Sequence, residues 1–368
     1  MPFSPELPYN DLPNLPPPHE IETKAILRRV ASSRAALASL AESLAQLPNA
    51  ELITNSIVLQ EAKDSSEIEN IITTHDELFK ALALHANLFE NTPAKEVIRY
   101  REALRIGFES LQNRGVINTP LVNLINAALL NHDAGVRRTP GTKLLNARTN
   151  EIIYTPPDGR ELLEFKLDRL WNYLQSSDTT ALDPLIKLAL LHYQFEAIHP
   201  YSDGNGRTGR ILNVLYLVHE GLLPFPVLYM SGFIIRTKPR YYDLLRYVTS
   251  GEKWEEWILY MIEVIERTAT SSRNLVAEIR SLRKEFERSI RAKATHIRQI
   301  HDLTEILFAQ PYSRIEFFVN AGIGSRKTIS SYLKALEELG VVVPYRILQH
   351  TVYINSPLLK LLSNWQID

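Results

Sequence analysis

The chain has 368 residues, which predicts two or three domains, and 45% of them are hydrophobic, which is enough for packed cores. Lysine and arginine number 41 against 42 aspartates and glutamates, so no overall field marks a binder of nucleic acid or membranes. The absence of cysteine excludes disulfides, thiol nucleophiles and cysteine-ligated metals. We find no apolar run of about eighteen residues and no secretion signal, and we expect a cytoplasmic location without membrane contact.

Residues 1–20 form a proline-rich segment. Proline disfavours the helical conformation of the residue before it, so we expect an extended arm. From residue 21 to about residue 90, apolar residues such as Ile26, Val30 and Leu37 recur at helical spacing, which predicts at least three helices. We assign residues 21–95 to an N-terminal helical region.

Residues 96–268 form the expected central region. Helices are predicted over 95–114 and 119–131, then over 162–174, from Asp183 to about Ala197, and over 207–219, 241–248 and 254–268. Asp183 is the predicted N-cap, with Pro184 at the first helical position. Over about 141–155, short apolar runs flank a polar tip, which predicts a β-hairpin.

The C-terminal part begins with a charged segment over residues 271–298, which we interpret as the solvated face of a linking helix over 269–298. Residues 299–368 then predict helices over 303–309, 314–319 and 325–339, with a glycine turn between the last two, and short strands over 341–343 and 351–354. This order is typical of a winged helix-turn-helix domain. The recognition helix of that domain would open with Ser325, Arg326, Lys327 and Ser330.

The run from His199 to Arg210 concentrates residue types that bind phosphate. Gly204 and Gly206 allow backbone amides to approach an anion at the start of the following helix, whose N-terminus is partly positive. Arg207 and Arg210 lie three residues apart and can bind phosphate oxygens from one face.

Two further residues of this run suggest chemistry. Asp203 offers a hard oxygen ligand for a Mg²⁺ carried by the phosphates. His199 is the candidate general base, because only its side chain can accept a proton near neutral pH.

The run also fits two other interpretations. Its glycines also fit the GxGxxG spacing of dinucleotide-binding folds, but that fingerprint follows a strand, and here the preceding segment is predicted to be helical. Alternatively, the glycines allow close helix packing and the arginines face solvent. That interpretation explains neither His199 nor Asp203.

The run resembles the signature loop of the Fic (Fic/Doc) domain, His-Pro-Phe-x-Asp/Glu-Gly-Asn-Gly-Arg-x-x-Arg, and departs from it only at Tyr201, where phenylalanine is usual. The resemblance, which extends over about residues 20–268, implies a mainly α fold: a helical bundle with a β-hairpin flap. It also implies a protein adenylyltransferase, which moves AMP from ATP to Ser, Thr or Tyr hydroxyls of proteins and releases pyrophosphate. In the phosphorylating branch of this superfamily a lysine replaces the second glycine, so Gly206 favours nucleotidyl transfer.

The resemblance also implies roles for individual residues. His199 deprotonates the target hydroxyl, and Asp203 holds Mg²⁺. The residues expected at the ATP site are Glu69, His199, Gly204, Asn205, Gly206, Arg207, Thr208, Gly209 and Arg210. Of these, Asn205 and Gly206 contact the α-phosphate and the arginines hold the triphosphate. The hairpin over about 141–155 is similar to the family's flap, which binds a target segment by strand addition. Tyr241 and Tyr242 fall where the family places a wall for the adenine, although either could equally be core.

Residues 65–70 allow two interpretations. Ser66 and Glu69 fit a capping box, which would start a helix. Ser65, Glu69 and Asn70 also match the family's inhibitory motif, Ser/Thr-x-x-x-Glu-Gly/Asn, which implies that Glu69 pairs with Arg210 and displaces the γ-phosphate of ATP. We favour this second interpretation beside a complete Fic loop. In some relatives the same glutamate helps to activate water that removes AMP, and the sequence leaves this activity open.

Over its whole length the chain is similar to bacterial full-length Fic proteins of the Shewanella type, which implies a homodimer and self-modification. The alternative function is that of a DNA-binding transcriptional regulator acting through residues 299–368. Winged helices also serve as dimerisation or target-docking modules, and the near-neutral charge does not favour DNA.

Overall fold

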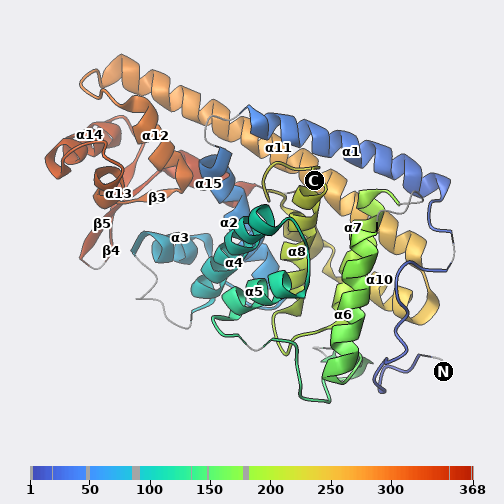
Figure 1. The fold of residues 1–368 in the computed structure, drawn as a ribbon. Coiled ribbons are helices and arrows are strands. Elements are labelled where there is room, and N and C mark those ends of the chain that lie inside the picture. The colour runs from blue at the N-terminus through green and yellow to red at the C-terminus, as the bar shows by residue number, and fades with distance from the viewer. Residues whose placement is uncertain are drawn as a thin grey trace.

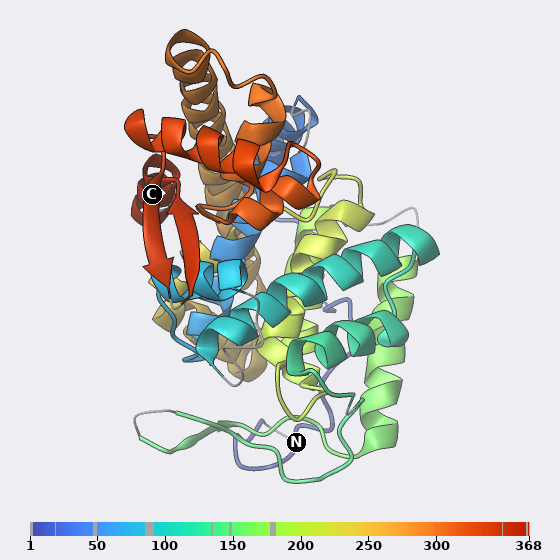
Figure 2. The same ribbon diagram turned by 90° about the vertical axis from the view of Figure 1, so that its left-hand side faces the viewer.

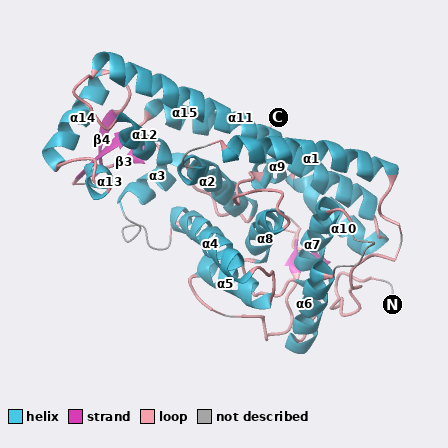
Figure 3. Cartoon of the chain, turned by 45° about the horizontal axis from the view of Figure 1, so that its top comes forward, coloured by secondary structure: helices cyan, strands magenta, loops and turns pink. Residues whose placement is uncertain are grey.

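The computed structural model describes residues 3–18, 20–46, 50–84, 92–133, 135–146, 149–176, 182–347, 349–365 and 367, with residues 50–54 described by their backbone only. These residues form a mostly helical molecule, which confirms the predicted fold class (Figure 3). None of the described helices is long and apolar enough to cross a membrane.

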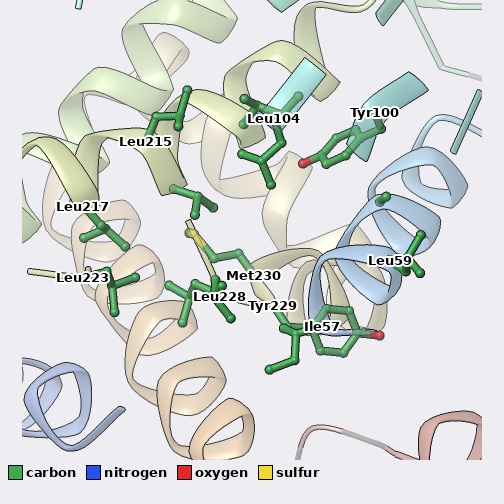
Figure 4. Close-up of a cluster of buried hydrophobic side chains, with 14 of the residues drawn as sticks. Ile57, Leu59, Tyr100, Leu104, Leu215, Leu217, Leu223, Leu228, Tyr229 and Met230 are labelled. Atoms are coloured by element: carbon green, nitrogen blue, oxygen red, sulfur yellow. The ribbon is translucent and has the colours of Figure 1, made fainter. Parts of the chain in front are cut away.

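The N-terminal region contains three helices, as the apolar spacing predicts: α1 (Lys24–Ala45), α2 (Ala50–Ile68) and α3 (His75–Leu84). Helix α1 lies along the long helix α11 (Trp254–Lys293) at one side of the molecule (Figure 1). Helix α2 instead enters the interior. Its buried Ile57 and Leu59 are part of an apolar cluster with Tyr100 and Met230, which fixes α2 beside the centre of the molecule (Figure 4).

Two buried helices form that centre: α7 (Pro184–Ile198) and α8 (Asn205–His219). Both are buried over nearly their whole circumference, which is the pattern of a helix enclosed by its neighbours. The predicted cap of α7 is confirmed, because the Asp183 side chain accepts a hydrogen bond from the Leu185 N–H at 2.8 Å. Helices α4 (Pro93–Arg114) and α5 (Thr119–Leu130) pack against α8, and α6 (Arg160–Gln175) and α11 pack against α7. Helix α10 (Lys238–Gly251) is hydrogen-bonded to α7, and α9 (Met230–Arg236) packs against α2 and α11.

The predicted hairpin is present as β1 (Leu144–Leu145) and β2 (Ile152–Tyr154), which are antiparallel, with Leu144 opposite Tyr154. It projects from the helical body (Figure 2). Residues 147 and 148 of its expected tip lie outside the described residues. Neither strand pairs with a third strand in the part of the chain that the structure describes, so each leaves one edge open.

The C-terminal region follows the expected order of helices and strands: α12 (Ile300–Ala309), β3 (Tyr312–Ser313), α13 (Ile315–Asn320), α14 (Arg326–Glu338), β4 (Val343–Ile347), β5 (His350–Ile354) and α15 (Ser356–Asn364). The strands form one sheet in the order β3-β5-β4. The strand expected over residues 341–343 lies later in the chain than predicted. Strand β4 begins at Val343, and Val341 and Val342 are buried residues that precede it. Strand β3 and helices α9 and α15 were not predicted from the sequence.

One boundary differs from the sequence prediction. The helix expected over residues 254–268 and the linking helix expected over 269–298 are a single helix, α11, of 40 residues. It contains neither glycine nor proline, and its apolar stripe continues through Leu275, Val276 and Ile279. The division of the chain into domains at residue 268 therefore falls inside a continuous helix.

Candidate active site

The loop between α7 and α8 has a conformation that its own residues maintain. His199 ends α7 with a left-handed φ of 49°, and Gly204 has a φ of 75° immediately before α8. Asn205 braces the turn, because its side chain accepts from the Tyr201 N–H at 2.8 Å and donates to the Tyr201 carbonyl at 2.7 Å. Tyr201 is buried, and its hydroxyl donates to Asn123 at 2.8 Å.

A carboxylate from the residue that follows α2 lies over the predicted phosphate site. Glu69 follows the end of α2, and its Oε1 atom is so close to Gly206 that a Cβ atom on residue 206 would overlap with it. The same Cβ would lie 2.9 Å from Arg210 Nη1. The N-terminus of α8 therefore has an anionic group of this chain where an anion was predicted to bind.

Arg210 is the partner of that carboxylate. The Arg210 side chain is 1% exposed and donates from Nε to Ser65 Oγ and from Nη2 to both the Ser65 carbonyl and Glu69 Oε1, each at 2.8 Å. Partial burial tends to raise the pKa of Glu69, but the charge and hydrogen bond of Arg210 outweigh this effect and lower it. Glu69 is therefore ionised at neutral pH, and the predicted contact between Glu69 and Arg210 is present.

The capping-box interpretation of residues 65–70 is wrong. Ser66 lies in the last turn of α2 rather than at a helix start, and its hydroxyl donates to the Ala62 carbonyl at 2.8 Å. Asn70 ends the helix with a left-handed φ of 63°, which asparagine tolerates better than most residues. The Lys238 ammonium, from the start of α10, donates to the Ile68 carbonyl at 2.6 Å and so holds the same helix end.

Arg207 pairs with other carboxylates. Its side chain is 3% exposed, and Nη1 donates to Glu96 Oε2 of α4 at 2.8 Å. Its Nη2 atom lies 3.6 Å from Asp203 Oδ1, and its buried Nε has no hydrogen-bond partner among the described residues. The two arginines predicted to share phosphates therefore come from one helix turn but bind different acids. The positive charge of Arg207 also helps to lower the pKa of Glu69, which places both arginines around one carboxylate.

His199 is uncharged in this site. Burial, and then the positive charge of Arg137, lower its pKa to about 4, so the ring is neutral at physiological pH. Arg137 also donates from Nε to the His199 carbonyl at 3.0 Å. Arg137 precedes the hairpin and lies 62 residues from His199 along the chain. No local sequence pattern therefore predicts this contact.

Thr208 and Gly209 of the loop, together with Glu196 of α7, have packing roles. Thr208 is buried and accepts from Asn126 Nδ2 at 3.2 Å, and the same Asn126 group donates to the Asp203 carbonyl at 3.0 Å. Gly209 leaves room for the Glu196 carboxyl, which would overlap with a Cβ there. Burial raises the pKa of Glu196 to about 7, so this group under the phosphate site is partly protonated at neutral pH.

The two tyrosines predicted to border the adenine differ in exposure. Tyr241 is 1% exposed, and its hydroxyl lies 2.8 Å from His192 Nε2 within a cluster that includes Trp257. Tyr242 is 39% exposed. Burial raises the pKa of its hydroxyl most, and the negative charge of Glu69 raises it further. Tyr241 is therefore core, which is one of the two alternatives for it, and of the two tyrosines Tyr242 remains the candidate for the predicted adenine wall.

The described residues contain no group of three or more acidic or histidine side chains that could hold a metal ion. Asp203 stands at the rim of the loop with its side chain 72% exposed, and it is a single carboxylate. That donor set fits a Mg²⁺ that arrives on phosphates, because Mg²⁺ is usually bound by one or two carboxylates together with phosphate oxygens and water.

Comparisons with known proteins agree with this fold. Residues 27–109 match the family profile described as Fic/DOC family N-terminal, and residues 282–358 match the one described as protein adenylyltransferase SoFic-like, C-terminal domain. The protein adenylyltransferase fic-1 of Caenorhabditis briggsae is 32% identical over 108 residues, which are 28% of this chain and 20% of that protein. The protein adenylyltransferase Fic of Nematostella vectensis is 34% identical over 114 residues, 30% of this chain and 25% of that protein.

Solved structures cover more of the chain. A Fic family protein from Desulfovibrio desulfuricans G20 superposes with a TM-score of 0.54 at 20% identity, over 92% of this chain and 98% of that one. A Fic domain containing signaling protein from Bacteroides thetaiotaomicron VPI-5482 gives 0.52 at 18% identity, over 69% and 97%. The chain thus has the fold of Fic-family structures, and its matched segments are similar to Fic-type protein adenylyltransferases. The alignments span only a fifth to a quarter of the curated relatives.

Proposed function

We propose that the protein is an autoinhibited protein adenylyltransferase that transfers AMP from ATP to Ser, Thr or Tyr hydroxyls of proteins, including its own. The observation that carries the proposal is the Glu69 carboxylate over Gly206, bound to Arg210 at the N-terminus of α8. A site that accepts this carboxylate has the charge and the backbone geometry to accept a phosphate. The names of the curated relatives support ATP as the nucleotide.

Different loop residues bind different parts of ATP. Once Glu69 moves aside, the backbone amides at Gly206 and the guanidinium of Arg210 bind phosphate oxygens, and Arg207 contributes its unpartnered Nε. Asp203 would hold Mg²⁺ at the exposed rim of the loop. When bound, this ion neutralises charge on the triphosphate. Tyr242 borders the adenine with its exposed ring face.

His199 acts as the general base for transfer. The neutral ring takes the proton of the target hydroxyl, whose oxygen attacks the α-phosphorus. The bond between the α-phosphorus and its bridging oxygen to the β-phosphate breaks, and pyrophosphate leaves with that oxygen. The target segment adds to an open edge of the β1–β2 hairpin, where main-chain hydrogen bonds place its hydroxyl with little demand on sequence.

Glu69 is the brake of this reaction. While it is bound to Arg210, its carboxylate occupies a ligand of the triphosphate and repels the terminal phosphate charge. Glu69 is also the candidate for activating water that removes AMP from a modified target. Release of AMP from purified, labelled protein by wild type but not by Glu69→Gly would support that second activity.

Residues 299–368 remain the predicted winged-helix domain. They contain six lysines and arginines against six aspartates and glutamates, and Arg326, at the start of α14, is paired with Glu316 at 2.9 Å. This balance favours docking of protein over binding of DNA. The expected homodimer and cytoplasmic location likewise remain predictions, of which the first is tested by the mass of the protein in solution.

The decisive experiment is label transfer from ATP labelled at the α or the γ position. We expect strong α-label on the Glu69→Gly variant, weak label on wild type, and none on Glu69→Gly/His199→Ala. The matched control is Glu67→Gly, because Glu67 pairs with Lys63 rather than with the loop. Transfer of γ-label would contradict the proposal, as would equal labelling of wild type and Glu69→Gly.

A further inference from the structure

The two ends of the hairpin meet at one arginine. Arg137, before β1, donates from Nη2 to the carbonyl of Pro157, after β2. The same side chain donates to the His199 carbonyl at 3.0 Å, and the Arg137 N–H donates to the Pro200 carbonyl at 2.9 Å. Arg137 therefore links both ends of the hairpin to the residue that carries the base.

The burial of Arg137 indicates that this geometry matters. The residue is 6% exposed, and its nearest carboxylate, on Asp158, lies 3.5 Å away. Burying a guanidinium is costly unless its donors are satisfied, and here backbone carbonyls satisfy them. One of those carbonyls belongs to His199, whose left-handed φ of 49° is held by the surrounding structure rather than by its own preference.

Tyr154 makes a second connection. It is the last residue of β2, and its hydroxyl donates at 2.7 Å to the carbonyl of Ala197, two residues before His199. Carbonyls in the last turn of a helix lack partners within the helix, so a side chain from the hairpin satisfies one of them. The end of the hairpin strand is thereby attached to the end of α7.

The proline-rich arm covers this attachment from outside. The ring of Phe3 stacks on Tyr154 with centroids 6.0 Å apart, and Tyr9 meets Tyr154 edge-on at 6.5 Å. The Tyr9 N–H donates to the Thr155 carbonyl at 3.0 Å, and Thr155 Oγ1 donates to the Pro5 carbonyl at 2.6 Å. The arm is thus ordered against the exit of the hairpin, as the extended conformation of its prolines permits.

We propose that Arg137 and Tyr154 are positioning residues that hold the hairpin and His199 as one unit, with the N-terminal arm as its outer support. This inference rests on the proposed transferase function. A target strand added to the hairpin then presents its hydroxyl at a set distance from the His199 ring. A displacement of about 1 Å between reacting groups can lower a rate by about 100-fold, so the connection acts on kcat.

The kinetic test uses Glu69→Gly as the parent and a peptide target with one hydroxyl. We expect Arg137→Lys, which keeps the charge but loses the forked donor, to lower kcat at least ten-fold with unchanged affinity for ATP. Tyr154→Phe, which loses only the hydroxyl, is expected to lower kcat about three- to ten-fold. The controls are Arg138→Lys, at an exposed neighbour, and Tyr247→Phe, at a residue 45% exposed. Unchanged kcat in both test variants overturns the proposal.

A second measurement separates this proposal from the proposed function. Amide hydrogen exchange of residues 152–154 should become at least ten-fold faster in Arg137→Lys and in Phe3→Ala/Tyr9→Ala, while α8 exchanges as in the parent. This readout does not require transfer of AMP. If the parent transfers no α-label, the proposed function fails, and exchange still decides whether the hairpin is held as we infer. Unchanged exchange overturns the positioning proposal whatever the activity.

Discussion

The two arginines of the 199–210 loop are each held by acids from other helices, Arg210 by Glu69 and Arg207 by Glu96. Buried guanidinium groups need such partners, because an unpaired charge in the interior is strongly unfavourable. Under the proposed function, a triphosphate competes with these carboxylates for the same donors. Of these two acids, Glu69 lies over Gly206, which is why we assign the brake to that residue and not to Glu96.

The pKa of His199 predicts how the rate of transfer depends on pH. Its pKa is lowered to about 4 from the ordinary 6.5, so the neutral, proton-accepting form persists well below neutral pH. The negative charge of Glu69 works in the opposite direction, so removing it does not raise this pKa. We expect kcat of the Glu69→Gly variant to stay level from pH 8 to about 5.5 and to fall towards pH 4. ATP affinity at each pH is the control, and a half-maximal rate near pH 6.5 would contradict the assignment.

The protonation of His199 also affects stability. A histidine with a lowered pKa in the folded state binds fewer protons than it does in the unfolded chain between about pH 4 and 6.5. The contribution of His199 to the free energy of unfolding is therefore fully present above about pH 6.5. It is lost as the pH falls from about 6.5 to about 4. His192 of α7, whose pKa burial lowers to about 3, acts in the same direction, so both histidines favour the folded state more at neutral pH than in acid.

At the scale of elements, α2 is placed by two kinds of contact. Its apolar side chains pack into the core, and buried polar groups fix its register: Glu61 accepts from the Ser231 N–H at 2.8 Å and from the Ser231 hydroxyl at 2.6 Å. Burial raises the pKa of Glu61 to about 7. These contacts lie upstream of Glu69 and leave the last turn of α2 to be held by Arg210 and Lys238.

The Lys238 side chain is expected to help keep Glu69 in its inhibitory position. Lys238→Met removes the hydrogen bond to the Ile68 carbonyl and a positive charge near Glu69, so the end of α2 should open more often. A loss of about 1 kcal/mol is typical of such a bond and corresponds to roughly five-fold. We expect basal α-label to rise about five-fold in otherwise wild-type protein, less than in Glu69→Gly. Lys253→Met, at an exposed lysine, is the control, and unchanged labelling of Lys238→Met would show that this cap does not act on the brake.

On the scale of the whole molecule, α2 lies between the central helices and the C-terminal region. Gln60 donates to the Leu362 carbonyl of α15 at 3.1 Å, and Trp365 packs on Tyr229 with ring centroids 4.6 Å apart. On α3, which follows α2, Phe79 stacks on Tyr312 of β3 at 5.6 Å. The C-terminal region therefore contacts α2, the helix that ends immediately before Glu69, as well as the helix after it.

This arrangement predicts that the C-terminal region supports the brake. Leu362 is 1% exposed, and Leu362→Ala should lower the free energy of unfolding by about 2–5 kcal/mol. We expect part of this loss to appear as increased α-label in otherwise wild-type protein, because α2 loses a supporting surface. Leu124→Ala, at a leucine 41% exposed, is the control. A lower thermal midpoint with unchanged labelling would show that the C-terminal region stabilises the fold without acting on Glu69.

The sequence by itself determined the elements whose signals are local. The helices around the core, the Asp183 cap, the hairpin and the compact loop from His199 to Arg210 follow from apolar period, capping residues and glycine spacing. It also predicted the contact between Glu69 and Arg210, through the resemblance of a short motif to a known family.

The tertiary structure decided the relations between residues far apart in the chain. It placed Glu96 against Arg207, Arg137 against His199, and the arm against Tyr154. It also showed that Ser66 lies within a helix end and that Tyr241 is core. The physical reason is that these pairings arise from packing of whole helices, which brings together side chains that no local period or cap relates.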